Sequence, residues 1–376
     1  MFTGAAGVAR MIGNWPQYNQ KRIVCILSED CEDINEKQYK CPMDVLSTIP
    51  IVNYYFKSRK YKRGLKQLLR ERHFDVIIYH NAWLAYGARQ MFRKLQLHTA
   101  IIAFIHDDNT LDMPDGFIPG NAAFGYLVRW FMERAVVPRL DRVLTNSEYL
   151  KGRVEETFHL KNTVRKLYYT AHDYPELSFR SKTIDPTKPV RILFAKSDFI
   201  RGGLQDLLSA LELLNHYRFD LTIAGPPKQR VLRKINPTLL QLNNVTINYP
   251  GRVKSWPEMI ALYHAHDLLC VPSRREALGL ANAEALACGT PVVTTTAGGI
   301  PEVMNNGMNG YLCKPGDIED LATKIRQCMT DFAQTAKQNE AGRAFVLERF
   351  NINTMFHTLD AILAEIVKHK LVPPQG

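Results

Sequence analysis

The sequence predicts an α/β protein in which two domains are each built on a parallel sheet. Short apolar runs rich in Val, Ile and Leu alternate with helical stretches in both halves of the chain. A polar, turn-rich segment at 176–188 lies between the halves and is typical of a linker. The 376 residues suffice for two domains that each bury a core.

The predicted elements follow from the apolar pattern. Uninterrupted apolar runs are typical of parallel strands buried on both faces. A small-residue helix at 281–288 ends at Gly289, and an apolar-periodic stretch at 354–367 predicts a terminal helix. The predicted strands lie at 22–27, 74–79, 100–105, 141–145, 190–194, 220–224, 245–249, 268–271 and 292–295.

Composition excludes several classes of protein. Hydrophobic content of 46% and charged content of 23% are ordinary for a globular protein. The seven cysteines form no C-x-x-C pair and no metal-ligand spacing, which indicates a reduced, cytoplasmic setting. The best candidate for a membrane span, 122–137, is interrupted by Arg129, Glu133 and Arg134. The N-terminus also lacks the apolar core of a signal peptide.

The most informative segment is 272–312, PSRREALGLANAEALACGTPVVTTTAGGIPEVMNNGMNGYL. Glu276 and Glu284 stand eight positions apart, and Gly279 between them permits a close backbone approach. The flanking strands and helices place these residues at one edge of a parallel sheet, where ligands bind. Carboxylates there suit sugar and ribose hydroxyls, and the N–H groups of helix N-termini suit phosphate. The alternative is that both glutamates lie on a solvated face.

A second group of charged residues surrounds the strand-to-helix turn after 190–194. Lys196 and Arg201 flank this turn, and Gly202 opens the following helix. Two cations and the free N–H groups of a helix N-terminus form a suitable cradle for a pyrophosphate. The alternative is ordinary surface charge.

Together these motifs resemble a known family. The pattern P-S-x-x-E-x-x-G-L-x-x-x-E-A-x-A-x-G-x-P-V-V, followed by G-G-x-x-E, is similar to the donor-site signature of glycosyltransferase family 4 (glycosyl transferases group 1). These are retaining nucleotide-sugar transferases of the GT-B fold, in which two Rossmann-like domains with parallel sheets face each other across a cleft. The resemblance implies an N-terminal acceptor-side domain at 1–178 and a C-terminal nucleotide-sugar-binding domain at 189–350. It also implies that a terminal helix at 351–376 crosses back to the N-terminal domain.

The resemblance assigns donor-site roles to individual residues. It implies that Glu276, with the backbone of Gly279 and Leu280, holds the transferred sugar. Glu284 is then the residue that holds the ribose. The residues nearest the base are Gly251, Arg252 and Val253.

The diphosphate of the donor is assigned to Lys196, Arg201 and the helix N-terminus at Gly202. The family carries Arg first and Lys second at the two cationic positions, so the residue types are exchanged here. Arg forms bidentate pairs and Lys acts as a point charge. We therefore expect the exchange to retain diphosphate binding but to change which phosphate oxygens are held. No metal and no other cofactor is implied, since these cations can neutralise the leaving diphosphate.

The N-terminal half contributes the acceptor side. His106 follows the strand at 100–105 and precedes Asp107, where the family places a histidine that faces the transferred sugar. The resemblance makes His106 catalytic together with Glu276, and a structural hydrogen-bonding histidine is the alternative. His80, at the end of the preceding strand, is a weaker candidate for the acceptor side.

Two turns depart from the family pattern. Gly7 and Arg10 resemble its N-terminal Gly-Gly-x-x-Arg loop, with Ala6 in place of the first glycine. Too few residues precede this loop to form the strand that the family has there. Because an omitted central strand would leave two exposed edges, we expect that the sequence begins late. Residues 170–173 stand in place of a hinge turn, and the family's glycine is absent from them.

Residues 57–72, KSRKYKRGLKQLLRER, hold eight bases and one acid. Tyr61, Leu65, Leu68 and Leu69 recur at helical spacing, so the segment predicts a basic amphipathic helix. One interpretation is a solvated helix with its apolar stripe on the core, and another is reversible contact with an anionic membrane surface. Nucleic acid is disfavoured, because no aromatic platform accompanies the charge.

The sequence thus predicts a retaining, hexosyltransferase-like enzyme that moves a sugar from a nucleoside-diphosphate sugar to an acceptor hydroxyl. The expected acceptor is a sugar or a lipid-linked molecule, in polysaccharide or glycolipid assembly at the inner face of the cytoplasmic membrane. Two other functions stay open, a catalytically inert nucleotide-sugar-binding protein and a nucleotide-sugar epimerase on the same fold. Turnover of donor without acceptor would indicate the epimerase, and donor binding without transfer the inert protein.

Overall fold

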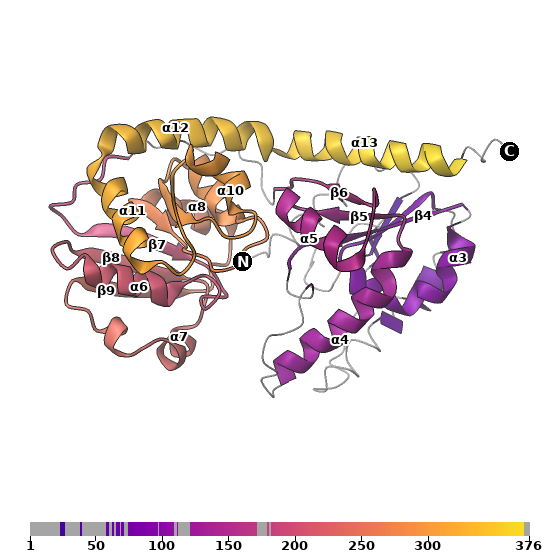
Figure 1. The fold of residues 1–376 in the computed structure, drawn as a ribbon, viewed down its shortest axis with the longest axis horizontal. Helices are drawn as coiled ribbons and strands as arrows, with labels where there is room; N and C mark the ends of the chain where they lie inside the picture. Colours follow the sequence, from indigo (N-terminus) through magenta and orange to yellow (C-terminus); the bar gives the residue numbers. More distant parts are fainter. Residues whose placement is uncertain are drawn as a thin grey trace. The chain divides into compact units, whose positions relative to one another are not determined.

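The computed structural model describes residues 74–96, 98–108, 121–170 and 182–371, with short pieces at 23–26, 38–39, 58–59, 62–63, 65–67, 69–70, 111 and 179. The chain divides into residues 2–171 with 352–376, the N-terminal unit, and residues 172–351, the C-terminal unit. Each unit has a parallel sheet surrounded by helices (Figure 1). The predicted α/β class with two parallel sheets is confirmed.

The sheet of the C-terminal unit has the order β12-β11-β10-β7-β8-β9, and all its neighbouring strands are parallel. The chain moves outward from β7 to β9, crosses back to β10 and moves outward the other way. The strand order therefore reverses between β7 and β10. In sheets of this kind the crevice at the carboxyl ends of the strands at such a reversal is where ligands bind. The strands are β7 (Val190–Ala195), β8 (Phe219–Ala224), β9 (Val245–Gly251), β10 (Leu268–Cys270), β11 (Val292–Thr295) and β12 (Tyr311–Cys313).

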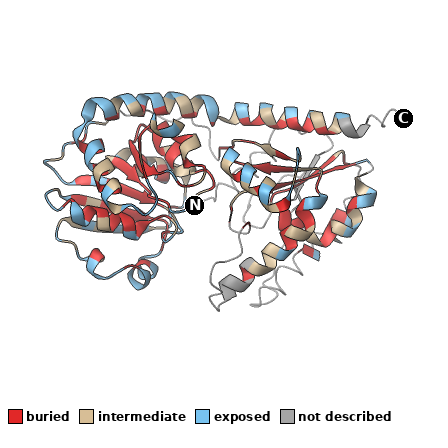
Figure 2. Ribbon diagram, in the orientation of Figure 1, coloured by how far each residue is buried: buried red, intermediate tan, exposed pale blue. Residues whose placement is uncertain are grey.

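Helices pack around this sheet. Helix α6 contacts α11 and helix α9 contacts α12, and Figure 2 shows buried strands among helices whose outer surfaces are exposed. Helix α11 buries Leu321, Ile325 and Cys328, which recur at helical spacing. The helices are α6 (Leu204–Leu213), α7 (Lys228–Lys234), α8 (Trp256–Ala265), α9 (Leu280–Ala287), α10 (Ile300–Val303), α11 (Ile318–Thr330) and α12 (Phe332–Arg349).

The sheet of the N-terminal unit has the order β2-β1-β3-β4-β5-β6 and is also parallel throughout. Every residue of β3 and β4 is buried, as expected for strands covered on both faces. The strands are β1 (Ile23–Ile26), β2 (Gln38–Tyr39), β3 (Val76–Tyr79), β4 (Ala100–Ile105), β5 (Arg142–Thr145) and β6 (Val164–Lys166). The helices are η2 (Ala82–Met91), α3 (Phe92–Leu95), α4 (Asn121–Val136), η3 (Val137–Arg139), α5 (Glu148–Phe158) and α13 (Ile352–Leu371).

Helix α13 belongs to the N-terminal unit although it ends the chain. It contacts β4, and its Leu359 and Leu363 are buried. Glu365 accepts a hydrogen bond from Arg142 of β5 at 3.1 Å and from Arg165 of β6 at 2.8 Å. An apolar stripe and one carboxylate shared by two guanidinium groups thus fasten this helix to its sheet.

Each strand that the sequence predicts is present, with ends that differ by at most two residues. Strands β2, β6 and β12 were not predicted. They have two or three residues each, and β2 and β6 contain polar or charged residues in place of an apolar run. The helix predicted at 281–288 is α9, and the predicted terminal helix is α13.

The basic segment 57–72 is helical wherever it is described. Leu65 is fully buried, whereas Arg63, Lys66 and Arg70 are exposed. At least one residue of the apolar stripe therefore packs on the core, while Tyr61 and Leu68 lie outside the described residues. Among the described helices, none is long and apolar enough to cross a membrane.

The loops that follow β7 and β10 touch main chain to main chain. Arg274 N–H donates to the carbonyl of Arg201 at 2.8 Å, and a Cβ on Gly203 would overlap the carbonyl oxygen of Pro272. Gly203 has a φ of 73° where α6 begins, so both its conformation and its contact require glycine. Residues 201–203 are thereby held beside 272–276.

We expect Gly203→Ala to destabilise the protein by about 3 kcal/mol, because it adds backbone strain and forces the two loops apart. Chemical denaturation measures the free energy of unfolding. The matched control is Gly152→Ala in α5, where a Cβ meets nothing within 4 Å. This control should stabilise the protein by up to about 1 kcal/mol. Equal stability of the two variants would contradict the requirement for glycine at position 203.

Candidate functional site

The crevice at the strand reversal contains an ion pair. Lys196 directly follows β7 and Glu276 lies in the loop after β10, and the two strands are neighbours in the sheet. The Lys196 ammonium group pairs with the Glu276 carboxylate, and both side chains are largely buried, at 24% and 17% exposure. The tertiary structure thus brings together a predicted diphosphate ligand and a predicted sugar ligand.

The turn that opens α6 lies against Lys196. A Cβ on Gly202 would be 2.9 Å from Lys196 Cγ, so the stem of the lysine runs along this turn. Arg201 is half-exposed on the same turn, and its N–H donates to Asp198 Oδ1 at 3.3 Å. The structure therefore places Lys196, Arg201 and Gly202 at one side of the crevice.

Arg274 lies in the loop after β10, which also carries Glu276. The sequence analysis assigned no role to this cation. It forms a bidentate pair with the buried carboxylate of Asp206 on α6, at 2.8 and 2.6 Å. Such a pair is geometrically specific. It fastens the loop that carries Glu276 to α6. Nothing in the spacing of Arg274 and Asp206 could have indicated the contact, because 68 positions separate them.

The N-terminus of α9 begins directly after Gly279. Gly279 has a φ of 91°, and a Cβ there would lie 2.9 Å from Asn282 Nδ2 and 3.5 Å from Glu276 Cγ. The first N–H groups of a helix have no acceptor one turn earlier in the helix, and the helix dipole is positive at this end. The N–H of Asn282 already donates to the carbonyl of Gly279 at 3.0 Å. Gly299 N–H donates to the Glu276 carbonyl at 3.1 Å, which joins the G-G-x-x-E segment of the motif to the same site.

Glu284 lies one turn into α9 and is half-buried. Its Oε2 accepts a hydrogen bond from the hydroxyl of Tyr263 on α8 at 2.7 Å. Burial raises the pKa of this carboxyl to about 7, and the Tyr263 hydrogen bond lowers that pKa. The sequence missed Tyr263, which lies in an apolar helix pattern where a core aromatic is the usual interpretation.

The residues predicted to lie near the base follow or end β9. Gly251 is the last residue of that strand, Arg252 is exposed and Val253 is buried. Gly225 N–H donates to the Gly251 carbonyl at 2.8 Å. A Cβ on Gly225 would lie 3.0 Å from the backbone nitrogen of Ser197, next to Lys196. Gly225 thus joins the end of β9 to the turn after β7, and the sequence analysis did not identify it.

His106 of the N-terminal unit forms hydrogen bonds with both ring nitrogens. Tyr169 Oη lies 2.9 Å from Nδ1, and the carbonyl of His80 lies 2.8 Å from Nε2. One tautomer of His106 satisfies this series of hydrogen bonds. Asn146 donates to the Tyr169 hydroxyl, the Tyr169 hydroxyl donates to Nδ1 of His106, and Nε2–H of His106 donates to the His80 carbonyl. Burial and the neighbouring His80 ring hold the pKa of His106 well below its usual range, so the ring is neutral. The catalytic role of His106 stays a prediction.

The other residues predicted on the acceptor side are partly described. His80 is buried with its ring 4.4 Å from that of His106, and Asp107 is half-buried. A cavity of about 10 Å³ adjoins His106 and Asp107, which is enough for one water molecule. Its walls are Asn81, Phe104, Ile105, His106, Asp107, Arg129 and Glu133. Gly7, Arg10 and residues 171–173 of the predicted hinge lie outside the described residues.

Comparison with known proteins identifies the family. A family model described as Glycosyl transferases group 1 matches residues 176–345, and one described as Glycosyltransferase Family 4 matches 22–170. N-acetyl-alpha-D-glucosaminyl L-malate synthase of Bacillus anthracis is 32% identical over 317 residues, which are 81% of this chain and 78% of that protein. The chain belongs to the group 1 glycosyltransferases.

Other relatives of this glycosyltransferase match at lower identity. D-inositol 3-phosphate glycosyltransferase of Mycolicibacterium smegmatis is 28% identical over 310 residues, 78% of this chain and 67% of that protein. Glycogen synthase of Mycobacterium tuberculosis is 28% identical over 229 residues, 60% of this chain. The match spans about half of that synthase, 54% of its length.

Solved structures show that the glycosyltransferase has the GT-B fold. Sucrose-phosphate synthase from Thermosynechococcus elongatus superposes with a TM-score of 0.74 at 19% identity, covering 97% of this chain and 92% of that one. Anabaena HepE in complex with UDP and glucose superposes with a TM-score of 0.71 at 17% identity, covering 97% and 96%. At these identities the likeness concerns the fold alone.

Within the part of the chain that the structure describes, no three His, Cys, Asp or Glu side chains are grouped so as to hold a metal ion. The described cysteines 270, 288, 313 and 328 are buried free thiols. A metal-independent reaction stays a prediction from the family resemblance.

The raised pKa of Glu284 predicts a pH-dependent stability. Between its ordinary value of 4.5 and about 7, the folded protein binds this proton more tightly than the unfolded chain does. The free energy of unfolding should therefore fall as pH rises through this window, by on the order of 3 kcal/mol from this residue. We expect Glu284→Gln to remove this contribution, as measured by urea denaturation from pH 4.5 to 8.

The matched control is Glu319→Gln, an exposed carboxylate in the first turn of α11. It should keep the pH dependence of the wild type. Parallel stability curves for the wild type and Glu284→Gln would show that Glu284 titrates normally.

Proposed function

We propose that this glycosyltransferase moves a sugar from a nucleoside-diphosphate sugar to an acceptor hydroxyl with retention of anomeric configuration, as a hexosyltransferase. The observation that carries the proposal is the Lys196–Glu276 pair at the carboxyl ends of β7 and β10. A cation suited to a diphosphate and a carboxylate suited to sugar hydroxyls meet where ligands of such sheets bind. Membership of the group 1 family supports the same reaction class.

The chemical task is to stabilise the diphosphate as it leaves. Lys196 and Arg201 supply positive charge, and the N-termini of α6 and α9 supply oriented N–H groups. These groups are held in place before the reaction, so little reorganisation accompanies the developing charge. No metal is required for this neutralisation, and no cofactor other than the donor is proposed.

The donor would lie along the crevice in a defined order. Gly251, Arg252 and Val253 adjoin the base, and Glu284 accepts hydrogen bonds from the ribose. Glu276 and the N–H groups after Gly279 and Leu280 hold the sugar. Uridine is the first base to test, because Anabaena HepE was solved with UDP and with UDP-glucose.

Glu276 pairs with Lys196 and offsets its charge. The diphosphate of the donor is the stronger partner for Lys196 because it carries more charge and more acceptor oxygens. Binding of the donor would therefore displace Glu276 from the lysine and release it toward the sugar. The two carboxylates then differ in role, with Glu284 acting in binding and Glu276 in transfer.

The acceptor is proposed to be a sugar or a lipid-linked molecule, in polysaccharide or glycolipid assembly. On this proposal His106 acts on the transferred sugar, and His80, Asp107, Gly7 and Arg10 line the acceptor side. The inert nucleotide-sugar-binding protein remains the second candidate, because both ring nitrogens of His106 are already hydrogen-bonded within its unit. A transfer assay separates the two.

The general test is a thermal-shift screen of nucleoside-diphosphate sugars, followed by a transfer assay with the donor that binds. A ligand at one hundred times its dissociation constant stabilises the protein by about 2.7 kcal/mol. Stabilisation with transfer supports the proposal. Stabilisation without transfer to any sugar or lipid-linked acceptor favours the inert protein, and donor turnover without acceptor favours the epimerase.

We predict that Lys196→Met weakens binding of the nucleoside diphosphate by roughly tenfold or more, with little effect on the nucleoside. The lost interaction is a charge-assisted hydrogen bond to phosphate. Isothermal titration calorimetry with UDP and uridine measures both affinities, and Arg201→Met should behave alike. Lys188→Met, an exposed lysine of the same unit, is the control for loss of charge. Equal losses for the two ligands would mean that Lys196 only supports the fold.

We predict that Glu276→Gln reduces transfer by at least about a hundredfold while the affinity for UDP is retained or increases. The affinity is not reduced because the substitution removes the carboxylate that competes for Lys196. Steady-state kinetics and calorimetry measure the two effects. Glu284→Ala should instead weaken UDP binding, so the two variants serve as controls for each other. Loss of UDP affinity in Glu276→Gln would contradict the assignment.

We also predict that residues 57–72 attach the protein reversibly to an anionic membrane surface. Arg63, Lys66 and Arg70 are exposed while Leu65 is buried, so charge rather than apolar insertion should dominate the contact. Co-sedimentation with anionic and neutral vesicles should show binding to anionic lipid that is lost at high salt.

Replacement of Arg63, Lys66 and Arg70 by glutamine should abolish vesicle binding. The matched control replaces three exposed bases of the other unit, Lys314, Arg326 and Lys337, by glutamine. Binding that ignores lipid charge, or that falls equally in both triple variants, would exclude residues 57–72 as the contact.

A further inference from the structure

Tyr263 contacts α9 and its C-terminal turn at two separate points. The residue lies near the end of α8 and is fully buried. Its hydroxyl donates to Glu284 Oε2 at 2.7 Å, and its carbonyl accepts from Thr290 Oγ1 at 2.6 Å. Thr290 follows Gly289, which has a φ of 79° where α9 ends. One residue thus fixes both the carboxylate on α9 and the turn that ends this helix.

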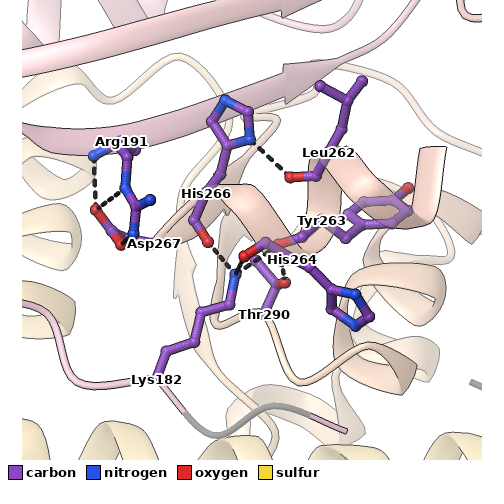
Figure 3. A network of polar contacts seen from close by, with 8 residues as sticks. All are labelled: Lys182, Arg191, Leu262, Tyr263, His264, His266, Asp267 and Thr290. Atoms are coloured by element: carbon purple, nitrogen blue, oxygen red, sulfur yellow. Dashed lines mark hydrogen bonds and ion pairs between the residues drawn. The ribbon is translucent and has the colours of Figure 1, made fainter. Parts of the chain in front are cut away.

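Lys182 supports the end of α8 that carries Tyr263. Its ammonium group donates to the carbonyls of Tyr263 at 2.5 Å and His264 at 3.3 Å, and also to that of His266. Figure 3 shows these carbonyls converging on the lysine. The last carbonyls of a helix lack intrahelical donors, and a cation there is favoured by the helix dipole. The lysine therefore holds the backbone at Tyr263 in place.

His266 joins the same helix end to the sheet. One ring nitrogen, Nδ1, lies 2.6 Å from the carbonyl of Leu262, and Nε2 lies 2.8 Å from Thr222 Oγ1 on β8. The next residue, Asp267, pairs with Arg191 of β7, as Figure 3 also shows. The position of Tyr263 is therefore set by the sheet as well as by Lys182.

Within the described part of the chain, the Glu284 carboxylate accepts its hydrogen bond from Tyr263. One carboxylate oxygen, Oε2, is engaged by this bond, which restricts rotation of the carboxyl group about its last torsion. The ribose would be bound by the other oxygen, Oε1. Because burial raises the pKa of Glu284 and the tyrosine lowers that pKa, the same bond favours the ionised acceptor.

We propose that Tyr263 is a positioning residue for the donor: it orients Glu284 so that the carboxylate accepts hydrogen bonds from the ribose hydroxyls. This inference rests on the proposed function, in which Glu284 contacts the ribose. Tyr263 does not touch the donor itself. Its effect should therefore appear only with ligands that carry ribose hydroxyls.

The test compares the affinities for UDP and for 2′,3′-dideoxy-UDP by calorimetry. The wild type should prefer UDP by roughly tenfold, the value of a hydrogen bond to a charged group. Tyr263→Phe should reduce this preference to less than about threefold, while its affinity for the dideoxy nucleotide equals that of the wild type. Glu284→Gln should reduce the preference in the same way. Cytidine, adenosine and guanosine diphosphates are also tested. If one of them binds more tightly than UDP, the comparison uses that nucleotide and its 2′,3′-dideoxy form.

The matched control is Tyr311→Phe. Tyr311 is another buried tyrosine of the same unit, and its hydroxyl lies 2.7 Å from Thr335 Oγ1, away from the predicted site residues. This variant loses a buried hydroxyl of the same kind and should keep the preference of the wild type. If Tyr263→Phe fails to fold, Thr290→Val removes the hydroxyl that binds the Tyr263 carbonyl and should reduce the preference in the same direction.

The outcomes separate this inference from the proposed function. A preference retained in Tyr263→Phe but lost in Glu284→Gln overturns the role of Tyr263 and leaves the ribose assignment intact. Equal weakening of both nucleotides in Tyr263→Phe also overturns it, because that result indicates a merely structural role. No preference in the wild type, a preference retained in Glu284→Gln, or no binding of any nucleoside diphosphate overturns the ribose assignment and this inference with it.

Discussion

The reversal of strand order between β7 and β10 is the constraint on which the candidate site depends. Two loops leave the carboxyl ends of adjacent strands there and must pass each other at close range. They do so through direct main-chain contact, which the glycine at 203 permits and the Arg274–Asp206 pair reinforces. Because the loops are fastened in this way, Lys196 and Glu276 are held at one point of the crevice.

The charged residues of the C-terminal unit differ in the groups with which they pair. Arg274 is engaged by a buried carboxylate, whereas Lys196 is paired with a residue that the proposed donor would displace. Glu284 is held by a neutral hydroxyl, and burial raises its pKa. The two carboxylates of the sequence motif therefore differ in environment, which is the physical basis for giving them different roles.

The sequence by itself determined the α/β class, the positions of the strands and the family. Parallel strands covered on both faces need uninterrupted apolar runs, and such runs are visible without any tertiary information. The glycines at the helix starts and the regular spacing of Glu276 and Glu284 are likewise local features. Strands β2, β6 and β12 were not predicted, and each is a short edge strand that pairs with a longer neighbour.

Only the tertiary structure decided which polar groups meet. Lys196 and Glu276 are 80 positions apart, and Tyr263 lies in an apolar helix pattern that predicts a core residue and nothing more. For His106 the sequence predicted a position at the end of a strand, and the folded chain decided that both ring nitrogens are hydrogen-bonded. The reason is physical: local pattern sets secondary structure, whereas contacts between side chains depend on how strands are ordered and how closely their loops approach.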